Sequence, residues 1–312
     1  MNESPTTENP PLRLAKLDKS YRKKKVLDQL DLKIATGSVV GLLGKNGAGK
    51  TTLIKCALGL MRPDRGEATI FGKSAWTLDA ETKARLGYVP QSVSLYSWMR
   101  IGQLVDYTAA FYPKWNAALV GDLLRDWELK ADDKAGNLSV GTQQKLAIIL
   151  AMGHEPDLLV LDEPAASLDP IARRQFLKAV LAVASDQTRT VVFSTHITSD
   201  LERVADRLAL LRDGRIVYDG ELDELKDSVK RWHVTAAAAL PADLDVPGAV
   251  HRRIEGAEAL LTVRGGTHQS REEIERRYSA SVRVEDLSLE DLFLELHEEG
   301  NHGEEVQHAP AR

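Results

Sequence analysis

The segment Gly41–Thr52 constrains the fold of this chain more than any other. Its residues 44–51 read Gly-Lys-Asn-Gly-Ala-Gly-Lys-Thr and match the pattern of a phosphate-binding P-loop, G-x-x-x-x-G-K-[ST]. The apolar run Ser38–Leu43 predicts a buried strand before the loop, and Thr51–Leu60 predicts a helix after it. The alternative is a glycine-rich turn that matches the pattern by chance, but such a turn would not need a strand before it and a helix after it. The segment therefore predicts a strand–loop–helix unit that binds a nucleoside triphosphate.

The residue types in the loop suit this chemistry. Glycines let successive backbone N–H groups point at one anion, and the N-terminus of the next helix adds positive potential. Lys50 is expected to reach the β- and γ-phosphates, and the Thr51 hydroxyl to bind Mg²⁺. The expected nucleotide-binding residues of the loop are Gly44, Asn46, Gly47, Ala48, Gly49, Lys50, Thr51 and Thr52.

Composition narrows the class of protein. The 312 residues are enough for two domains. The net charge of −5 shows no excess of basic residues, so we expect no nucleic-acid partner. The single cysteine, Cys56, excludes an internal disulfide and is typical of a reducing compartment. We find neither a signal-peptide pattern nor an apolar run long enough to cross a bilayer. We therefore expect a cytoplasmic protein that reaches a membrane only through a partner.

The hydrophobic pattern predicts an α/β core interrupted by helices. Apolar runs at Leu158–Leu161 and Thr190–Phe193 predict strands, with a helix at Ile171–Ala184 between them. Alternation over Arg13–Ile34 predicts antiparallel edge strands, and Asp213-Gly214 predicts the turn of a hairpin over 207–218. The expected divisions are a flexible N-terminus at 1–11, a nucleotide-binding core at 12–228 with a helical subdomain at about 92–155, a small accessory domain at 229–299 and a disordered tail at 300–312.

The accessory domain is predicted to be α+β. Short strands are expected at Val234–Ala239, Ala259–Val263 and Ser281–Val284, with one polar helix at Gln269–Tyr278. A last helix is indicated by apolar residues on one helical face, namely Leu289, Leu292, Phe293 and Leu296.

Two carboxylates end the apolar strand at 158–161. Asp162 is placed to hold Mg²⁺ through its water shell, and Glu163 to orient the attacking water and accept its proton. The alternative is an ordinary strand terminus with exposed acids. The P-loop upstream favours the catalytic interpretation.

With these motifs in place, the chain resembles the nucleotide-binding subunit of an ABC transporter over about residues 12–228. The run Leu138–Lys145, Leu-Ser-Val-Gly-Thr-Gln-Gln-Lys, resembles the signature L-S-G-G-Q of that family and begins a predicted amphipathic helix. The resemblance implies that this helix N-terminus binds the ATP held by a second subunit. The residues concerned are Ser139, Val140, Gly141 and Thr142. A simple helix cap by Ser139 is the alternative.

Further positions match the family. Tyr21 resembles the aromatic residue that stacks on adenine, although a structural role is the alternative for it alone. Gln91 resembles the glutamine that contacts Mg²⁺ and the attacking water, and it begins the segment that meets the membrane partner. His196 resembles the histidine that contacts the γ-phosphate. Ser167 and Asp169, in Ser-Leu-Asp, resemble the loop that meets its counterpart across the dimer.

The signature departs from the family pattern at two positions. Val140 replaces a glycine and Thr142 replaces the glutamine. If the family glycine needs a positive φ, valine would be strained there, whereas a helical conformation would tolerate it. Slower turnover, or a heterodimer in which this signature serves the weaker site, is a further alternative for the altered signature.

The resemblance implies an ATPase that uses ATP and Mg²⁺, with Glu163, His196 and Gln91 as catalytic residues and Thr51, Gln91 and Asp162 at the metal. It implies dimerisation, as a homodimer or alternatively a heterodimer, and an integral membrane permease as partner on the inner face of the membrane. The segment 96–115 is rich in aromatic residues, most of which are expected to belong to the core of the subdomain; the alternative is that an exposed subset receives the permease. The ending Asp286–Leu296 resembles the ending of ATPases from export-type two-component systems and favours efflux; the alternative is a helix that docks the accessory domain, which explains the same apolar spacing.

Other classes fit less well. A non-transport ABC ATPase, either regulatory or translation-associated, is the main alternative, but translation factors carry two cassettes in one chain. A chromosome-maintenance ATPase would insert a long coiled coil between Thr52 and Asp162, and this gap is too short for one. A small-molecule kinase would lack the signature and His196.

Overall fold

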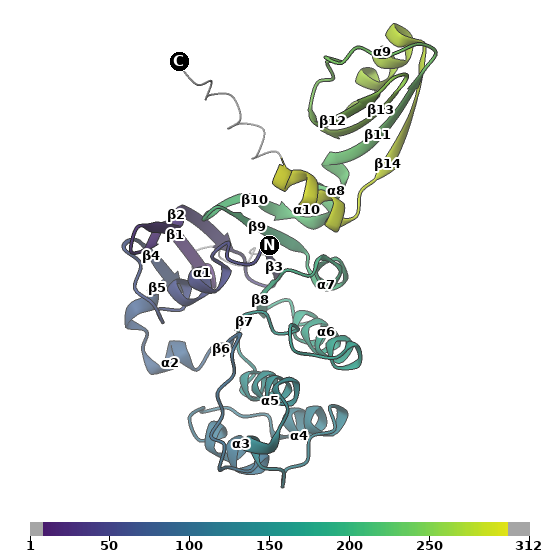
Figure 1. The fold of residues 1–312 in the computed structure, drawn as a ribbon. Coiled ribbons are helices and arrows are strands. Elements are labelled where there is room, and N and C mark those ends of the chain that lie inside the picture. Colours follow the sequence, from purple (N-terminus) through teal and green to yellow (C-terminus); the bar gives the residue numbers. More distant parts are fainter. Residues whose placement is uncertain (1–8, 299–312) are drawn as a thin grey trace, which may run out of the picture. The chain divides into compact units, whose positions relative to one another are not determined.

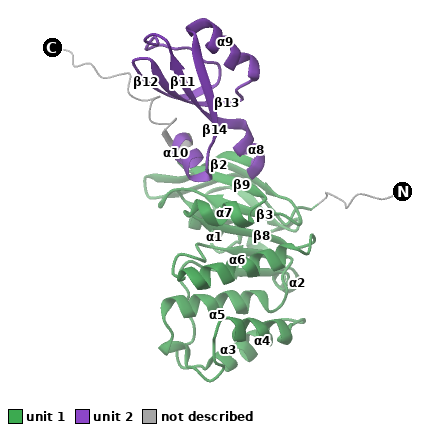
Figure 2. Cartoon of the chain, turned by 90° about the vertical axis from the view of Figure 1, so that its right-hand side faces the viewer, with its two compact units in different colours: residues 1–219 green, residues 220–312 purple. Residues whose placement is uncertain are grey.

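The computed structural model describes residues 9–298, and in it the chain forms two compact units, Met1–Asp219 and Gly220–Arg312 (Figure 2). The division falls within strand β10, whereas the sequence placed the domain boundary after Ser228. The flexible N-terminus expected for 1–11 lies mostly outside the described residues, and the tail expected for 300–312 lies entirely outside them. Within 9–298, no helix is long and apolar enough to cross a membrane.

The first unit is built on two sheets. The central six-stranded sheet has the order β10-β9-β3-β8-β7-β6, and its neighbours β9-β3, β3-β8, β8-β7 and β7-β6 are parallel. Its strands are β3 Val39–Leu43, β6 Leu86–Val89, β7 Leu158–Leu161, β8 Thr190–Thr195, β9 Arg207–Arg212 and β10 Arg215–Glu221. Strands β3, β7 and β8 are buried along their whole length, as expected for parallel strands covered on both faces.

An antiparallel sheet of order β2-β1-β4-β5 forms the edge layer. It contains β1 Leu12–Tyr21, β2 Lys24–Ile34, β4 Arg65–Ile70 and β5 Lys73–Ser74. The predicted α/β class with an antiparallel edge is thus confirmed. The hairpin β9–β10 is confirmed as well: Asp213 and Gly214 between its strands have φ of 48° and 77°, the left-handed pair that a tight hairpin turn needs.

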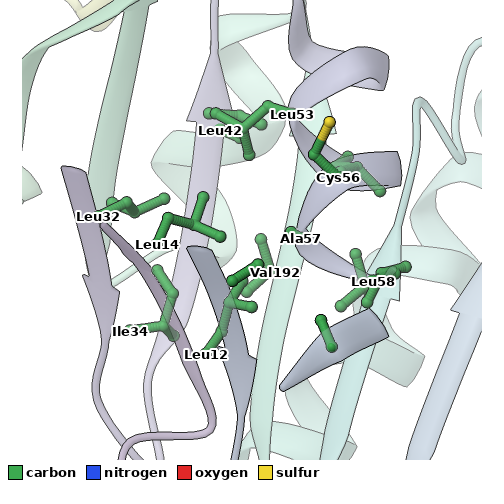
Figure 3. Packing of buried hydrophobic residues seen from close by; sticks show 14 of the residues in the cluster. Leu12, Leu14, Leu32, Ile34, Leu42, Leu53, Cys56, Ala57, Leu58 and Val192 are labelled. Carbon is green, nitrogen blue, oxygen red and sulfur yellow. The ribbon is translucent and has the colours of Figure 1, made fainter. Parts of the chain in front are cut away.

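Helix α1 (Lys50–Ala57) packs between the two sheets (Figure 3). Leu53 and Cys56 of this helix join a buried cluster with Leu14 and Ile34 of the edge sheet and Val192 of the central sheet. Cys56 is 1% exposed, and burial raises the pKa of its thiol to about 11, so it remains protonated at neutral pH. The P-loop helix is therefore held by apolar contacts on both sides.

Most of the remaining helices of this unit lie where the sequence predicted helices, but those at Ala80–Lys83 and Thr198–Val204 were not predicted. The remaining helices are α2 Ala80–Lys83, α3 Ile101–Ala109, α4 Ala117–Asp126, α5 Val140–Met152, α6 Pro170–Ala184 and α7 Thr198–Val204, with short 3₁₀ turns at Ala75–Thr77 and Ala135–Asn137. Helices α3, α4 and α5 lie together as the helical subdomain (Figure 1). The expectation that α5 is amphipathic is wrong, because α3, α4 and β6 all contact it and Ile148–Met152 are buried without a polar face.

The second unit is a four-stranded antiparallel sheet of order β12-β13-β11-β14. Its elements are α8 Leu222–Ser228, β11 Val229–Ala236, β12 Ala249–Glu255, β13 Glu258–Arg264, α9 His268–Tyr278, β14 Ala280–Asp286 and α10 Leu289–Glu298. Ile274 of α9 packs with Trp232, Leu261 and Val282 of the sheet. The strand expected at 234–239 was misplaced, since β11 starts at Val229 and ends at Ala236. The side chain of Leu296 lies outside the described residues.

Candidate functional site

The P-loop connects β3 to α1, and its glycines are required by a close backbone contact at Gly44 and by positive φ angles at Gly47 and Gly49. A Cβ on Gly44 would lie 2.7 Å from the Leu211 carbonyl oxygen. Gly47 and Gly49 have φ of 82° and 109°, which other residues rarely adopt. Helix α1 begins at Lys50, directly after Gly49, so its unpaired N–H groups open towards the loop.

One cavity of about 350 Å³ brings together most of the residues predicted to bind ATP or to act in catalysis. It is lined by Tyr21, Val26, Asn46, Gly47, Gly49, Lys50, Thr51, Thr52, Gln91, Glu163, Ala166 and His196. Three parallel strands explain this convergence, because the carboxyl ends of β3, β7 and β8 meet at one edge of the sheet, next to the P-loop. Gly44 and Ala48 belong to the loop but do not line the cavity, and neither do Asp162 or the signature residues.

Glu163 is held from two sides. Its Oε1 lies 3.0 Å from Lys50 Nζ, and its Oε2 lies 2.9 Å from His196 Nδ1. Lys50 also donates to the Gly44 carbonyl at 2.7 Å. Both Lys50 and Glu163 are 6% exposed, whereas His196 is exposed. A buried carboxylate between a lysine and a histidine has a fixed orientation towards the P-loop.

Asp162, at the end of β7, is fully buried, and its two oxygens differ. Its Oδ1 accepts a hydrogen bond from Ser194 Oγ at 2.7 Å, while its Oδ2 is buried with no hydrogen-bond partner. The Thr51 hydroxyl lies 3.5 Å from Gln91 Oε1. Carboxylate, amide and hydroxyl oxygens are the donors that Mg²⁺ takes in proteins, usually a few at a time together with substrate phosphates. The side chains present therefore fit that ion.

Tyr21 lies at the end of β1 and lines the cavity with a half-exposed ring. Its hydroxyl lies 2.9 Å from the sulfur of Met61. The ring is thus accessible from the cavity, while its hydroxyl group contacts Met61.

The signature residues form the N-terminus of α5. Ser139 is the N-cap, its Oγ accepts the Thr142 N–H at 3.2 Å, and the two hydroxyls lie 2.8 Å apart. Val140 is the first helical residue, has a negative φ and is 70% exposed. The valine is therefore free of backbone strain.

Gly141 and the loop at 167–169 touch within the same chain. A Cβ on Gly141 would lie 2.6 Å from the carbonyl oxygen of Ser167, closer than any real contact. Asp169 caps α6, and its Oδ1 accepts the N–H groups of Ala172 and Ile171 at 2.9 Å. These hydrogen bonds, that of Ala172 first, lower the pKa of Asp169 below its usual range.

The aromatic residues of the helical subdomain divide into two groups. Tyr112 stacks on His154 with ring centroids 3.8 Å apart, and burial lowers the pKa of His154 to about 4. The Tyr112–His154 pair therefore contributes to the packing of the subdomain. A second group consists of Tyr96, Trp98, Tyr107 and Phe111, which touch one another in series and are 44–72% exposed. We call these four residues the aromatic patch.

Comparisons with known proteins place the chain in a family. The family described as ABC transporter matches residues 27–166. The bacitracin transport ATP-binding protein BcrA of Bacillus licheniformis is 31% identical over 220 residues, which are 69% of this chain and 71% of BcrA. The chain belongs to the ATP-binding subunits of ABC transporters. The nucleoside triphosphate of the P-loop is accordingly ATP, and the ABC subunit is an ATPase.

Two further comparisons show how much of the chain resembles a known protein and which fold it shares. The Nod factor export ATP-binding protein I of Burkholderia lata is 32% identical over 299 residues, covering 92% of this chain and 96% of that protein, so the likeness extends into the second unit. A solved ATP-binding subunit of an ABC transporter has a TM-score of 0.64 at 30% identity and covers 69% of this chain and 92% of its own. The predicted ABC ATPase fold is confirmed.

Three residues at this ABC site were not found from the sequence. Val26 and Ala166 line the cavity but lie in no motif. Ser194 contacts Asp162 and Glu163, and its only sequence signal is its place two residues before His196 at the end of a buried strand. Its contacts with Asp162 and Glu163 could not be predicted from the sequence without knowing that β7 pairs with β8.

Proposed function

We propose that this chain is the ATP-hydrolysing subunit of an exporter, and that two copies close around two Mg-ATP to drive a separate integral membrane permease. The observation that supports this most is the cavity in which Lys50, Gln91, Glu163 and His196 converge with the P-loop. The similarity to bacitracin transport and Nod factor export proteins favours efflux. The subunit would work on the inner face of the membrane, held there by the permease.

Each side chain has a defined task in this proposal. Lys50 binds the β- and γ-phosphates, and the γ-phosphate competes with Glu163 for its ammonium group. Glu163 Oε1 is then free to orient water and accept its proton, while His196 keeps Oε2 in place. Thr51, Gln91 and Asp162 hold the metal, and Tyr21 offers its ring to adenine. Bound Mg²⁺ neutralises charge on the phosphate oxygens.

The signature supports the dimeric form of the proposal. Ser139, Val140, Gly141 and Thr142 do not line the cavity of their own chain, and the N-terminus of α5 is a site that favours anions. A second copy that presents this helix end to the γ-phosphate would complete the site. Ser167 and Asp169 lie beside it and would meet the second copy there.

The Gly141→Ala substitution tests this arrangement. Its Cβ would push against the Ser167 carbonyl of the same chain, and overpacking of this kind costs about 1–3 kcal/mol of folding stability unless the start of α5 moves away from that loop. Because this movement displaces the helix end proposed to meet the second copy, we expect ATP-dependent dimerisation to weaken, with unchanged nucleotide affinity of the monomer. Dimerisation is measured by sedimentation velocity with Mg²⁺ and a non-hydrolysable ATP analogue.

The matched control is Gly121→Ala in helix α4, where a new Cβ would meet no atom within 4 Å, and this variant should dimerise as the wild type does. Normal dimerisation of Gly141→Ala would contradict the proposed interface. Absence of any ATP-dependent dimer in the wild type would contradict the dimeric function itself.

The aromatic patch is the surface proposed to receive the permease. Large exposed aromatic rings are typical anchors at protein interfaces. The double substitution Trp98→Ala with Tyr96→Ala should weaken copurification with the permease at least tenfold and leave ATP affinity unchanged. Trp76→Ala removes a tryptophan that is 54% exposed and does not belong to the aromatic patch, and it should change neither quantity. Equal permease binding by both variants would contradict the proposed surface.

A further inference from the structure

Ser194 is a buried hydroxyl that belongs to no motif yet lies behind the catalytic carboxylates. Its exposure is 0%, and it sits one residue before the end of β8. Strands β7 and β8 are parallel and pair Leu161 with Phe193, so the next residue of each strand, Asp162 and Ser194, are neighbours. The hydroxyl is thus placed by the register of the sheet.

The hydroxyl bridges two consecutive site residues, and the direction of both hydrogen bonds is fixed. The Glu163 N–H can only donate, and it does so to Ser194 Oγ at 2.8 Å. The hydroxyl proton therefore remains available for Asp162 Oδ1, at 2.7 Å. Hydrogen bonds from a hydroxyl to a carboxylate are short and strong, so this contact orients the whole carboxylate.

The bridge has two consequences at the site. With Oδ1 taken by Ser194, the buried Oδ2 of Asp162 is the oxygen left without a partner. Glu163 has a φ of 48°, a left-handed conformation that is unfavourable for its side chain, and the hydrogen bond from its N–H to Ser194 holds that peptide in place. A single hydroxyl thus fixes the backbone of one carboxylate residue and the side chain of the other.

We propose that Ser194 is a positioning residue that presents Asp162 Oδ2 to the metal of Mg-ATP and holds the Glu163 peptide in its left-handed conformation. This inference rests on the proposed function, because it assumes that Asp162 serves the metal. A purely structural role, in which the hydroxyl only links β7 to β8, would affect folding stability without affecting the response to Mg²⁺.

The test compares Ser194→Ala with Thr190→Val in the full-length protein. Thr190 is another fully buried hydroxyl on the same strand, but its Oγ1 accepts the Gly37 N–H at 3.1 Å, away from the site. The affinity for a fluorescent non-hydrolysable ATP analogue is measured in EDTA and during a Mg²⁺ titration, and thermal unfolding is recorded alongside. These readouts need no turnover.

For Ser194→Ala we expect unchanged affinity in EDTA and a Mg²⁺ concentration for half-maximal tight binding that is raised roughly tenfold or more, as for other residues that orient metal ligands. Thr190→Val should lower the unfolding temperature without moving the Mg²⁺ midpoint. If Ser194→Ala does not fold, Ser194→Cys keeps a weaker donor of similar size and should give a smaller shift in the same direction.

Two results would overturn the inference: a folded Ser194 variant with the wild-type Mg²⁺ midpoint, or an equal shift in Thr190→Val. If the nucleotide affinity of the wild-type protein did not respond to Mg²⁺ at all, the proposed function itself would be contradicted. The two failures are therefore distinguishable.

Discussion

Replacing Glu163 with glutamine is expected to lower kcat for ATP hydrolysis by about 10²–10⁴-fold, because the amide cannot take the proton of the attacking water. The amide is almost the same size as the carboxylate. Its one oxygen can still accept from Lys50, at 3.0 Å in the wild type, and its NH₂ group can donate to His196 Nδ1, at 2.9 Å, when that nitrogen carries no proton. ATP affinity should therefore remain within a few-fold of the wild type. A phosphate-release assay and an equilibrium nucleotide titration measure the two quantities separately.

The same variant should accumulate as an ATP-bound dimer, since closure no longer ends in hydrolysis. The control is Glu155→Gln, which removes a surface carboxylate paired with Arg189 at 3.0 Å and should leave turnover unchanged. Turnover of Glu163→Gln within tenfold of the wild type would remove Glu163 from the role of general base.

The Lys50→Ala substitution is expected to act on ATP binding and on stability together. Loss of hydrogen bonds to charged phosphates costs about 1.5–3 kcal/mol, or roughly tenfold to hundredfold in affinity. Lys50 is also the buried counter-charge of Glu163, so its removal leaves a buried carboxylate with only His196 beside it. Breaking such a pair should lower the free energy of unfolding by up to about 3 kcal/mol.

A second substitution separates these two effects. Adding Glu163→Gln to Lys50→Ala removes the unpaired buried charge, so stability should recover in part while ATP affinity remains low. Lys45→Ala, in the same loop but exposed and outside the cavity, should alter neither property. Nucleotide titration and urea unfolding provide the two measurements. Wild-type ATP affinity in Lys50→Ala would contradict the phosphate-binding role of this lysine.

The elements predicted correctly from the sequence depend on local patterns. The P-loop, the strand before Asp162 and the hairpin turn at Asp213-Gly214 each follow from residues that are adjacent in the chain. Strand β12 was missed because Ala249–Glu255 contains His251, Arg252 and Arg253, and a polar edge strand has no clear hydrophobic alternation.

The contacts within the site could not be predicted, because they depend on strand order and register. The lysine of the P-loop meets Glu163 only because β8 lies between β3 and β7, with all three parallel. The bridge from Ser194 to Asp162 requires the pairing of Leu161 with Phe193. The question of whether Val140 is strained required the start of α5, which places that residue in a helical turn.

The contact between Gly141 and Ser167 has a consequence for the entropy of assembly. The start of α5 rests on the loop that leads into α6, and Asp169 fastens that loop to α6 through two backbone hydrogen bonds. The start of α5 and the loop before α6 are therefore already ordered in the single chain, and neither has to become ordered on association. In the proposed dimer, less conformational freedom would then be lost on association, so the interface would hold the subunits more tightly than its area alone suggests.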